Sequence, residues 1–270
     1  MADLGIGIVG AAGRMGMALA RAVSEAEGCR IVAATERSGH ASLGADIGSL
    51  AGLDALGVAV TDATSSLFAA VDAVLDFTAP QATAAHGVFA SENGTILVTG
   101  TTGLEQNQQA AIETAARSVA VVQAPNFSVG VNVALALVEQ TARLLDEDYD
   151  IEVVEMHHRH KVDAPSGTAL GLGHAAAKGR GVSLDTVAER GRDGITGARE
   201  RGTIGFASLR GGDIVGEHNV VFAGPAERVE ITHRAGGREI FARGAVRAAL
   251  WAADKPAGLY SMADVLGFNG

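Results

Sequence analysis

The sequence is poor in cysteine, proline and aromatic residues. Cys29 is the only cysteine among 270 residues, so no intramolecular disulfide can form, and we expect a reducing compartment, the cytoplasm. Proline occurs 5 times and aromatic residues make up 4% of the chain, whereas glycine occurs 36 times. This composition is typical of a soluble α/β protein whose backbone approaches a ligand closely.

Long apolar runs and an excess of positive charge are also missing. No stretch reaches the ~20 apolar residues that span a bilayer, and the N-terminus lacks the basic region of a secretory signal. The formal net charge of -10 argues against a nucleic-acid partner, because such partners require a basic face. With 47% hydrophobic residues the chain can bury a substantial core. We therefore expect a soluble protein with neither a membrane nor a nucleic-acid partner.

The pattern of apolar residues predicts two domains. Up to residue 129, short apolar runs alternate with helical periodicity, which favours a parallel sheet. After 130 a long amphipathic helix precedes strand-like runs with few helices, which predicts a second α+β domain with a mixed open sheet. The expected fold is α/β: a Rossmann-type domain at 1–129, on which a helical segment at 241–270 packs, and a substrate-binding and oligomerisation domain at 130–240. The expected strands of the first domain are 4–10, 29–36, 70–78, 95–103 and 119–128, with helices at 14–28, 81–94 and 104–118 and an irregular stretch at 37–69.

A glycine-rich turn joins the first expected strand to the first helix. Glycines at 10, 13 and 16 give the pattern G-x-x-G-x-x-G, and Glu36 ends the second strand. A turn without Cβ atoms lets backbone N–H groups approach a pyrophosphate, and the carboxylate of Glu36 can accept from the ribose hydroxyls of NAD. Arg37 suits the 2′-phosphate of NADP, so the sequence leaves NADH and NADPH open, and it is equally consistent with an ordinary surface residue. The alternative is a structural turn beside a solvated glutamate.

Three further strand ends carry polar or small residues. Because ligands of open parallel sheets bind at the carboxyl ends of the strands, these segments are expected to line the same nicotinamide cofactor site. Taken singly, each is equally consistent with a capped turn. The segments are Asp76-Phe77-Thr78, Gly100-Thr101-Thr102-Gly103 and Ala124-Pro125-Asn126-Phe127.

The run EMHHRHKVDAPSGTA, residues 155–169, gathers five titratable or cationic side chains between His157 and Lys161. In an extended strand, Glu155, His157, Arg159 and Lys161 would share one face of the strand. Such a cluster attracts an anionic substrate and supplies proton donors with pKa values near neutrality. A metal site is the first alternative, but no carboxylate or cysteine accompanies the histidines at ligand spacing, so we expect no metal. A solvated strand edge is the second.

A helix start follows the cluster closely. Ser166 is a good N-cap, and Gly167 and Thr168 are then the first helical residues. Free N–H groups at a helix N-terminus, with a hydroxyl beside them, bind a carboxylate. A cationic strand end and an anion-binding helix start, four residues apart, together suit a small substrate with two carboxylates.

These motifs resemble those of the dihydrodipicolinate reductase family of the diaminopimelate route to lysine. EMHHRHKVDAPSGTAL is similar to the family signature E-x-H-H-x-x-K-x-D-x-P-S-G-T-A, and the resemblance covers nearly the whole chain. Pro125 stands where some relatives have alanine, which affects only backbone near the cofactor. Other similar stretches are GAAGRMG, GTTG, APNFSVGVN, GTIGFASLRGGDIVGEH and ITHRA.

The resemblance implies a homotetrameric 4-hydroxy-tetrahydrodipicolinate reductase, assembled through the sheets of the second domain, that reduces a dihydrodipicolinate-type dicarboxylate to tetrahydrodipicolinate with NADH or NADPH. The sequence leaves open whether the hydroxylated or the dehydrated substrate is bound. It implies His157 as proton donor and acceptor and Lys161 as a second donor. The implied substrate-binding residues are His158, Gly167 and Thr168. The implied cofactor-binding residues are Gly10, Ala11, Ala12, Gly13, Arg14, Met15, Glu36, Arg37, Gly100, Thr101, Thr102, Ala124, Pro125, Asn126 and Phe127.

Two other functions compete. Another NAD(P)-dependent dehydrogenase of a small anionic amino-acid precursor, such as a semialdehyde, would more often carry a nucleophilic cysteine in its second domain, and the only cysteine is at 29. A cofactor-sensing regulator would normally carry a basic DNA-binding module, which this acidic chain lacks.

Overall fold

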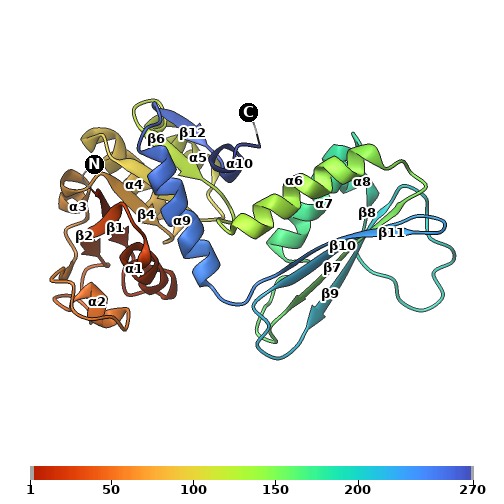
Figure 1. Ribbon diagram of the computed structural model, residues 1–270, viewed down its shortest axis with the longest axis horizontal. Coiled ribbons are helices and arrows are strands. Elements are labelled where there is room, and N and C mark those ends of the chain that lie inside the picture. Colours follow the sequence, from red (N-terminus) through yellow and green to blue (C-terminus); the bar gives the residue numbers. More distant parts are fainter. Residues whose placement is uncertain (1–2, 269–270) are drawn as a thin grey trace. The chain divides into compact units, whose positions relative to one another are not determined.

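The computed structural model describes residues 3–268 of the chain. The chain folds as two compact units, one of Met1–Val129 with Arg238–Gly270 and the other of Gly130–Gly237. Figure 1 shows that each unit contains its own sheet and its own helices. Within the described residues, no helix has both the length and the apolar character needed to cross a membrane.

The first unit is built on a seven-stranded sheet with the order β12-β6-β5-β4-β1-β2-β3. All of its neighbouring strands pair in parallel, so the predicted Rossmann-type sheet is confirmed. The strand order reverses at β1, and the crevice for a ligand in such sheets lies at the carboxyl ends of the strands near this point. The strands are β1 (Leu4–Val9), β2 (Cys29–Thr35), β3 (Val60–Thr61), β4 (Ala73–Asp76), β5 (Ile96–Thr99), β6 (Ala120–Gln123) and β12 (Gly258–Tyr260).

Helices cover both faces of this sheet. Successive strand residues point to opposite faces, so Leu75 packs in the core beneath α1 and α9, whereas Val74 packs with α3, α4 and α5. Burial on both faces explains why the strands read as continuous apolar runs. Figure 1 shows α9, from the end of the chain, beside α1. The helices are α1 (Arg14–Glu25), α2 (Ile47–Leu50), α3 (Thr64–Ala70), α4 (Pro80–Asn93), α5 (Gln106–Ala115), α9 (Glu239–Ala252) and α10 (Met262–Leu266).

Two sequence-based expectations for this unit were wrong. The stretch expected to be irregular contains β3 and the helix α3, whose Leu67 and Phe68 are 3% and 1% exposed. Seven residues are too few for helical periodicity to show in the sequence. The segment expected to return as helix alone also contains β12, which pairs with β6 and extends the sheet. Its three residues are too few to show a strand pattern in the sequence, and they form a strand because they pair with β6.

The second unit is built on a five-stranded sheet with the order β11-β10-β7-β9-β8. The central strand β7 pairs antiparallel with β10 and parallel with β9, which confirms the predicted mixed sheet. The strands are β7 (Asp150–His157), β8 (Ala188–Glu189), β9 (Ile204–Arg210), β10 (Glu217–Ala223) and β11 (Arg228–Arg234), and the helices are α6 (Val129–Leu144), α7 (Gly167–Gly179) and α8 (Leu184–Val187).

One face of this sheet is covered and the other is not. Figure 1 shows α6 and α7 along one face, where Ile151 and Val153 of β7 are 0% exposed. The alternate residues of β7 and its neighbours point the other way, and Leu209 among them is 47% exposed. We call this second surface the open face, and define it by Val154, Met156, Ala207, Leu209 and Val221.

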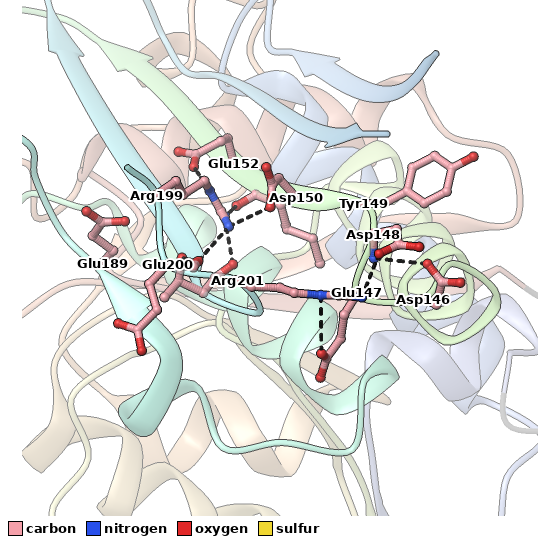
Figure 2. Close-up of polar contacts among 12 residues, drawn as sticks. Asp146, Glu147, Asp148, Tyr149, Asp150, Glu152, Glu189, Arg199, Glu200 and Arg201 are labelled. Carbon is pink, nitrogen blue, oxygen red and sulfur yellow. Dashed lines mark hydrogen bonds and ion pairs between the residues drawn. The ribbon is translucent and has the colours of Figure 1, made fainter. Parts of the chain in front are cut away.

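A group of ion pairs fastens the connection between β8 and β9 to the start of β7. The guanidinium of Arg199 bonds to Asp150 Oδ1 at 2.8 Å and Glu152 Oε1 at 3.0 Å. It also donates to the backbone carbonyls of Ile151 and Thr203 at 2.9 and 2.7 Å. Figure 2 shows this arginine among the carboxylates. The Arg199 side chain is 17% exposed, so these contacts stabilise the strand that leads to the histidine cluster.

Candidate active site

The histidine cluster lies where β7 ends. His157 is the last residue of the strand and is 8% exposed. The chain then turns: the backbone N–H of His158 donates to the carbonyl of Ile214 at 2.7 Å, and that of Lys161 donates to the carbonyl of His158 at 3.1 Å. The expectation that Arg159 and Lys161 continue the strand face of His157 is therefore wrong. Their backbone bonds to a loop and to the turn itself, not to a neighbouring strand.

His157 is held by a buried carboxylate. Its Nδ1 lies 2.5 Å from Oε2 of Glu155, which is 1% exposed. Arg210 donates to both oxygens of Glu155, at 2.9 Å each, and the backbone N–H of Ser166 donates to Oε1 at 3.2 Å. Burial by itself would raise the pKa of Glu155, but the hydrogen bonds from Arg210, Ser208 and His157 lower it to about 2. Glu155 is therefore ionised at neutral pH.

Two neighbouring imidazoles are disfavoured as cations. Burial lowers the pKa of His157, and the carboxylate of Glu155 offsets this only in part. The ring of His218 lies edge-on to that of His157, with centroids 5.1 Å apart, and its Nε2 is 3.1 Å from Oγ of Ser166. Burial, followed by the charge of His157, lowers the pKa of His218 to about 4. At pH 7 both rings are neutral until an anion comes close.

The two other candidate groups of the cluster differ in what they contact. The ammonium of Lys161 lies 2.9 Å from Oδ1 of Asp163, and this bond lowers the pKa of Asp163. The side chain of Lys161 is 20% exposed, so solvent or a ligand can reach it. Nδ1 of His158 is buried and has no hydrogen-bond partner among residues 3–268. A polar ligand atom can satisfy it.

The start of α7 adjoins the cluster. Ser166 is the N-cap, and its hydroxyl accepts from the backbone N–H of Ala169 at 3.1 Å, which confirms the predicted cap. Gly167, the first helical residue, has open space where a side chain would be, and the first turn carries no acidic residue. The helix N-terminus therefore offers partial positive charge to an anion. Contacts of Ser166 with Glu155 and His218 keep this helix start next to His157.

The glycine-rich turn of the first unit has the geometry of a pyrophosphate cradle. Gly10 has a φ of +68°, which favours glycine, and a Cβ on Gly16 would lie 2.3 Å from the carbonyl oxygen of Gly10. The N-cap of α1, Gly13, has no side-chain hydrogen bond to the helix start. Glu36 stands at the turn, because its Oε2 accepts from the N–H of Ala12 at 3.2 Å. These features fit a dinucleotide bound at the start of α1.

Two pockets lie at the carboxyl ends of the parallel strands. The first, of about 340 Å³, is lined by residues that include Gly10, Glu36 and Arg37. The second, of about 380 Å³, is lined by residues that include Thr101, Thr102, Ala124 and Pro125. Thr78 lines the first pocket and donates its backbone N–H to Oγ1 of Thr101 at 3.1 Å, which joins the two. The fold thus brings the expected cofactor segments to one edge of the sheet.

Comparison with known proteins matches both units. The model "Dihydrodipicolinate reductase, N-terminus" matches residues 4–127, and "Dihydrodipicolinate reductase, C-terminus" matches residues 130–266. The 4-hydroxy-tetrahydrodipicolinate reductase of Ruegeria pomeroyi is 56% identical over 263 residues, which are 97% of this chain and 98% of the relative. The chain belongs to the dihydrodipicolinate reductase family. The resemblance noted from the motifs is confirmed.

Solved structures with the same fold include both members of this family and enzymes outside it. The dipicolinate-bound dihydrodipicolinate reductase of Paenisporosarcina sp. TG-14 has a TM-score of 0.75 and 25% identity, and the match covers 96% of this chain and 97% of the other. An amine dehydrogenase of Mycobacterium smegmatis shares the fold with a TM-score of 0.61 at 15% identity, over 97% of this chain and 95% of the other. Because the fold is shared more widely than the dihydrodipicolinate reductase family, function has to be argued from the site.

Several cofactor residues expected from the family are buried in the core of the first unit. The side chain of Ala11 is 0% exposed and that of Phe127 is 1% exposed, and the ring of Phe127 packs edge-on against Phe77 with centroids 5.3 Å apart. Met15 packs on the same core, whereas Arg14 is exposed. A Cβ on Gly100 would lie 2.1 Å from the ring of Phe77, so no larger residue fits there. These positions shape the backbone at the site and leave polar contacts to other residues.

The first pocket is also lined by a histidine that no sequence motif predicts. His86 lies inside α4, is 6% exposed, and its Nδ1 is 2.9 Å from Oδ2 of Asp76, which is 0% exposed. Thr78 donates its hydroxyl to the other oxygen of Asp76 at 2.6 Å. Asp76 at a strand end was a visible signal, but His86 had none. Among residues 3–268, no three His, Cys, Asp or Glu side chains are placed to hold a metal ion.

Proposed function

We propose that this member of the family reduces 4-hydroxy-tetrahydrodipicolinate to tetrahydrodipicolinate with NADH or NADPH. The observation that carries the proposal is the joining of His157 to the N-terminus of α7 through Glu155 and Ser166, in a chain 56% identical to a reductase of that name. Proton-donating groups and an anion-binding helix start then lie at one place, which is what reduction of a dicarboxylate requires.

Binding of the substrate rests on charge complementarity. One carboxylate is held by the backbone N–H groups of Gly167 and Thr168 at the start of α7, and by Nδ1 or Nε2 of His158. Lys161 leaves Asp163 to contact the anion, since an ammonium on a flexible stem moves at little cost. These side chains orient the substrate by its charged groups.

The proton step belongs to His157, with Lys161 as second donor. The 4-hydroxyl group of the substrate leaves as water, and the reduced nicotinamide, when bound, would supply a hydride to the conjugated imine that remains. Negative charge then develops on the substrate and must be neutralised by a proton. A dianionic substrate raises the pKa of His157, which counteracts the lowering by burial, so the imidazole takes up the proton it will donate.

The cofactor is held by the first unit. Backbone N–H groups at the start of α1 bind the pyrophosphate, because those of Ala11, Ala12 and Gly13 already donate within the protein. The loops that contain Thr101 and Asn126 bind nearer the nicotinamide. Glu36 suits the ribose hydroxyls of NADH, and the guanidinium of Arg37 suits the additional phosphate of NADPH, so this chain uses either. Both side chains line the pocket of about 340 Å³.

A cysteine-dependent dehydrogenase is disfavoured by the position of the single thiol. Cys29 lies in β2, is 6% exposed, and points to the carbonyl of Val23 at 3.9 Å. Burial, with a contribution from Asp3, raises the pKa of the thiol, so it is a poor nucleophile.

The open face of the second unit supports assembly into a homotetramer, and the single cysteine suits the cytoplasm as its compartment. It presents Met156, Val221 and Leu209 from three adjacent strands, while the opposite face is covered by α6 and α7. The same face also carries polar side chains, Glu152, Asn219 and Glu217 among them, so a second copy that covers it would meet both apolar and polar groups.

A coupled assay tests the proposed function. An upstream synthase makes the substrate in situ, and oxidation of NADH and of NADPH is followed by absorbance. We expect turnover with both cofactors, and at least about tenfold lower kcat for His157→Gln and for Lys161→Ala because each removes a proton donor. Fluorescence titration should show that both variants still bind NADH.

His174→Gln is the matched control, because His174 is exposed on α7 away from its N-terminus. It should retain the wild-type rate. No cofactor oxidation by the wild type, or wild-type kcat in either site variant, would refute the proposal.

A further inference from the structure

The carboxylate of Glu155 has more donors than an ordinary ion pair. Oε2 accepts hydrogen bonds from Nη1 of Arg210 and Nδ1 of His157. Oε1 accepts hydrogen bonds from Nη2 of Arg210 and the backbone N–H of Ser166. The residue is 1% exposed, so these contacts are not exchanged for water. A buried carboxylate with this many donors is held rigidly and keeps its partners in place.

We infer that Glu155 is a positioning residue that holds His157 with its proton on Nδ1 and leaves Nε2 for the reaction. This inference rests on the proposed role of His157 as proton donor and acceptor. An ionised carboxylate can only accept hydrogen bonds, so at the contact with Glu155 the imidazole must be the donor. Neutral His157 therefore carries its hydrogen on Nδ1, and its Nε2 has a free lone pair.

The surroundings of Nε2 are consistent with this orientation. A Cβ on Gly216 would lie 3.0 Å from Nε2 of His157, so the glycine leaves room beside that nitrogen. The charged and titratable groups around the ring come from separate elements: Glu155 from β7, Arg210 from β9, His218 from β10 and Lys161 from the turn after β7. Among these, only Glu155 bonds to the ring.

Glu155 also links the proton donor to the anion site. Its Oε1 accepts from the N–H of Ser166, the cap of α7, and Ser166 in turn contacts His218. One carboxylate thus sets the position of the imidazole relative to the helix start. Loss of the charge would release both, while the cofactor pocket of the other unit would keep its own residues.

Substitution Glu155→Gln tests the inference through the pH profile. Because the carboxylate raises the pKa of His157 against burial, its removal lowers that pKa. We expect kcat to fall at least about tenfold, the descending limb of the kcat profile to move to lower pH, and NADH affinity to stay unchanged. Wild-type kcat with an unmoved profile would overturn the inference.

A spectroscopic measurement tests it without any turnover. In wild-type protein labelled with ¹⁵N-histidine and free of ligands, the ring signals of His157 should report the tautomer with hydrogen on Nδ1, assigned by their loss in His157→Gln. The opposite tautomer would overturn the inference even if Glu155→Gln failed to fold. Since no substrate is present, this result is independent of whether the reductase activity itself is found.

Glu152→Gln is the matched control. Glu152 lies on the same strand and is also paired with arginines, Arg192 at 2.8 Å and Arg199 at 3.0 Å, as Figure 2 shows for Arg199. It points to the face opposite that of His157. The substitution Glu152→Gln should leave kcat, the pH profile and the His157 tautomer unchanged. If it changed them as Glu155→Gln does, both effects would come from a less stable strand, and the inference would fail.

Discussion

At the scale of single residues, burial decides the chemistry of the histidines. His157 and His218 are 8% and 5% exposed, yet only His157 contacts a carboxylate. The ring of His218 has a hydrogen bond to the hydroxyl of Ser166, whereas its Nδ1 has no hydrogen-bond partner among the described residues. Burial therefore keeps the His218 ring uncharged down to acidic pH. Glu155 raises the pKa of His157 against the effect of burial, which favours proton transfer by that residue.

A first prediction at this scale concerns stability and pH. The pKa of His218 is about 4 in the folded protein against 6.5 as reference, so between these values the unfolded chain binds more protons than the folded one. Stability falls as pH falls through this window, by at most on the order of 3 kcal/mol from this residue. His218→Gln should show a smaller loss of unfolding free energy between pH 7 and pH 4 in urea titrations. An equal loss in both proteins would contradict it.

At the scale of elements, the packing of α1 on the glycine-rich turn depends on a missing side chain. A Cβ on Gly16 would lie 2.3 Å from the carbonyl oxygen of Gly10 and 2.6 Å from that of Ala11. Both are backbone atoms and cannot move without moving the turn. The close approach that favours a pyrophosphate is thus the same feature that requires glycine.

Gly16→Ala should therefore lower stability by about 1–3 kcal/mol and weaken NADH binding, because the helix and the turn must separate. Thermal unfolding and fluorescence titration measure the two effects. Gly171→Ala is the control: it is also a helical glycine, but its Cβ would meet Leu135 at 3.5 Å, an ordinary contact. It should be neutral or stabilising by up to ~1 kcal/mol. Similar losses in both variants would argue against the close-approach explanation.

At the scale of the whole molecule, the open face is the surface through which we expect copies of the chain to associate. Leu209 is 47% exposed within the chain, and a charge there would be buried if a second copy covered the face. We expect the wild type to have the mass of the proposed tetramer in light scattering and Leu209→Glu to have that of smaller species, with the circular dichroism unchanged. Leu144→Glu, at a 77% exposed position at the end of α6, should leave the mass unaltered. A tetramer in both variants would exclude the open face as the interface.

Prediction from the sequence succeeded where the signal is local. The apolar runs of the first unit, the cap at Ser166 and the glycine turn are each encoded within about a dozen residues. It failed for α3 and β12, whose few residues acquire their structure from neighbours. It also extended the strand of His157 too far, because the turn at His158 is made by a bond to Ile214, distant in the sequence.

The sequence by itself determined the fold class, the family and the chemical groups at the site, since strand alternation, glycine spacing and the HHRHK run are properties of neighbouring residues. Only the tertiary structure decided how those groups behave. Arg210 meets Glu155 across 55 positions, and Asp76 meets His86 across strand and helix. Burial, ionisation and the direction of a hydrogen bond follow from such contacts, which exist only once distant segments are packed together.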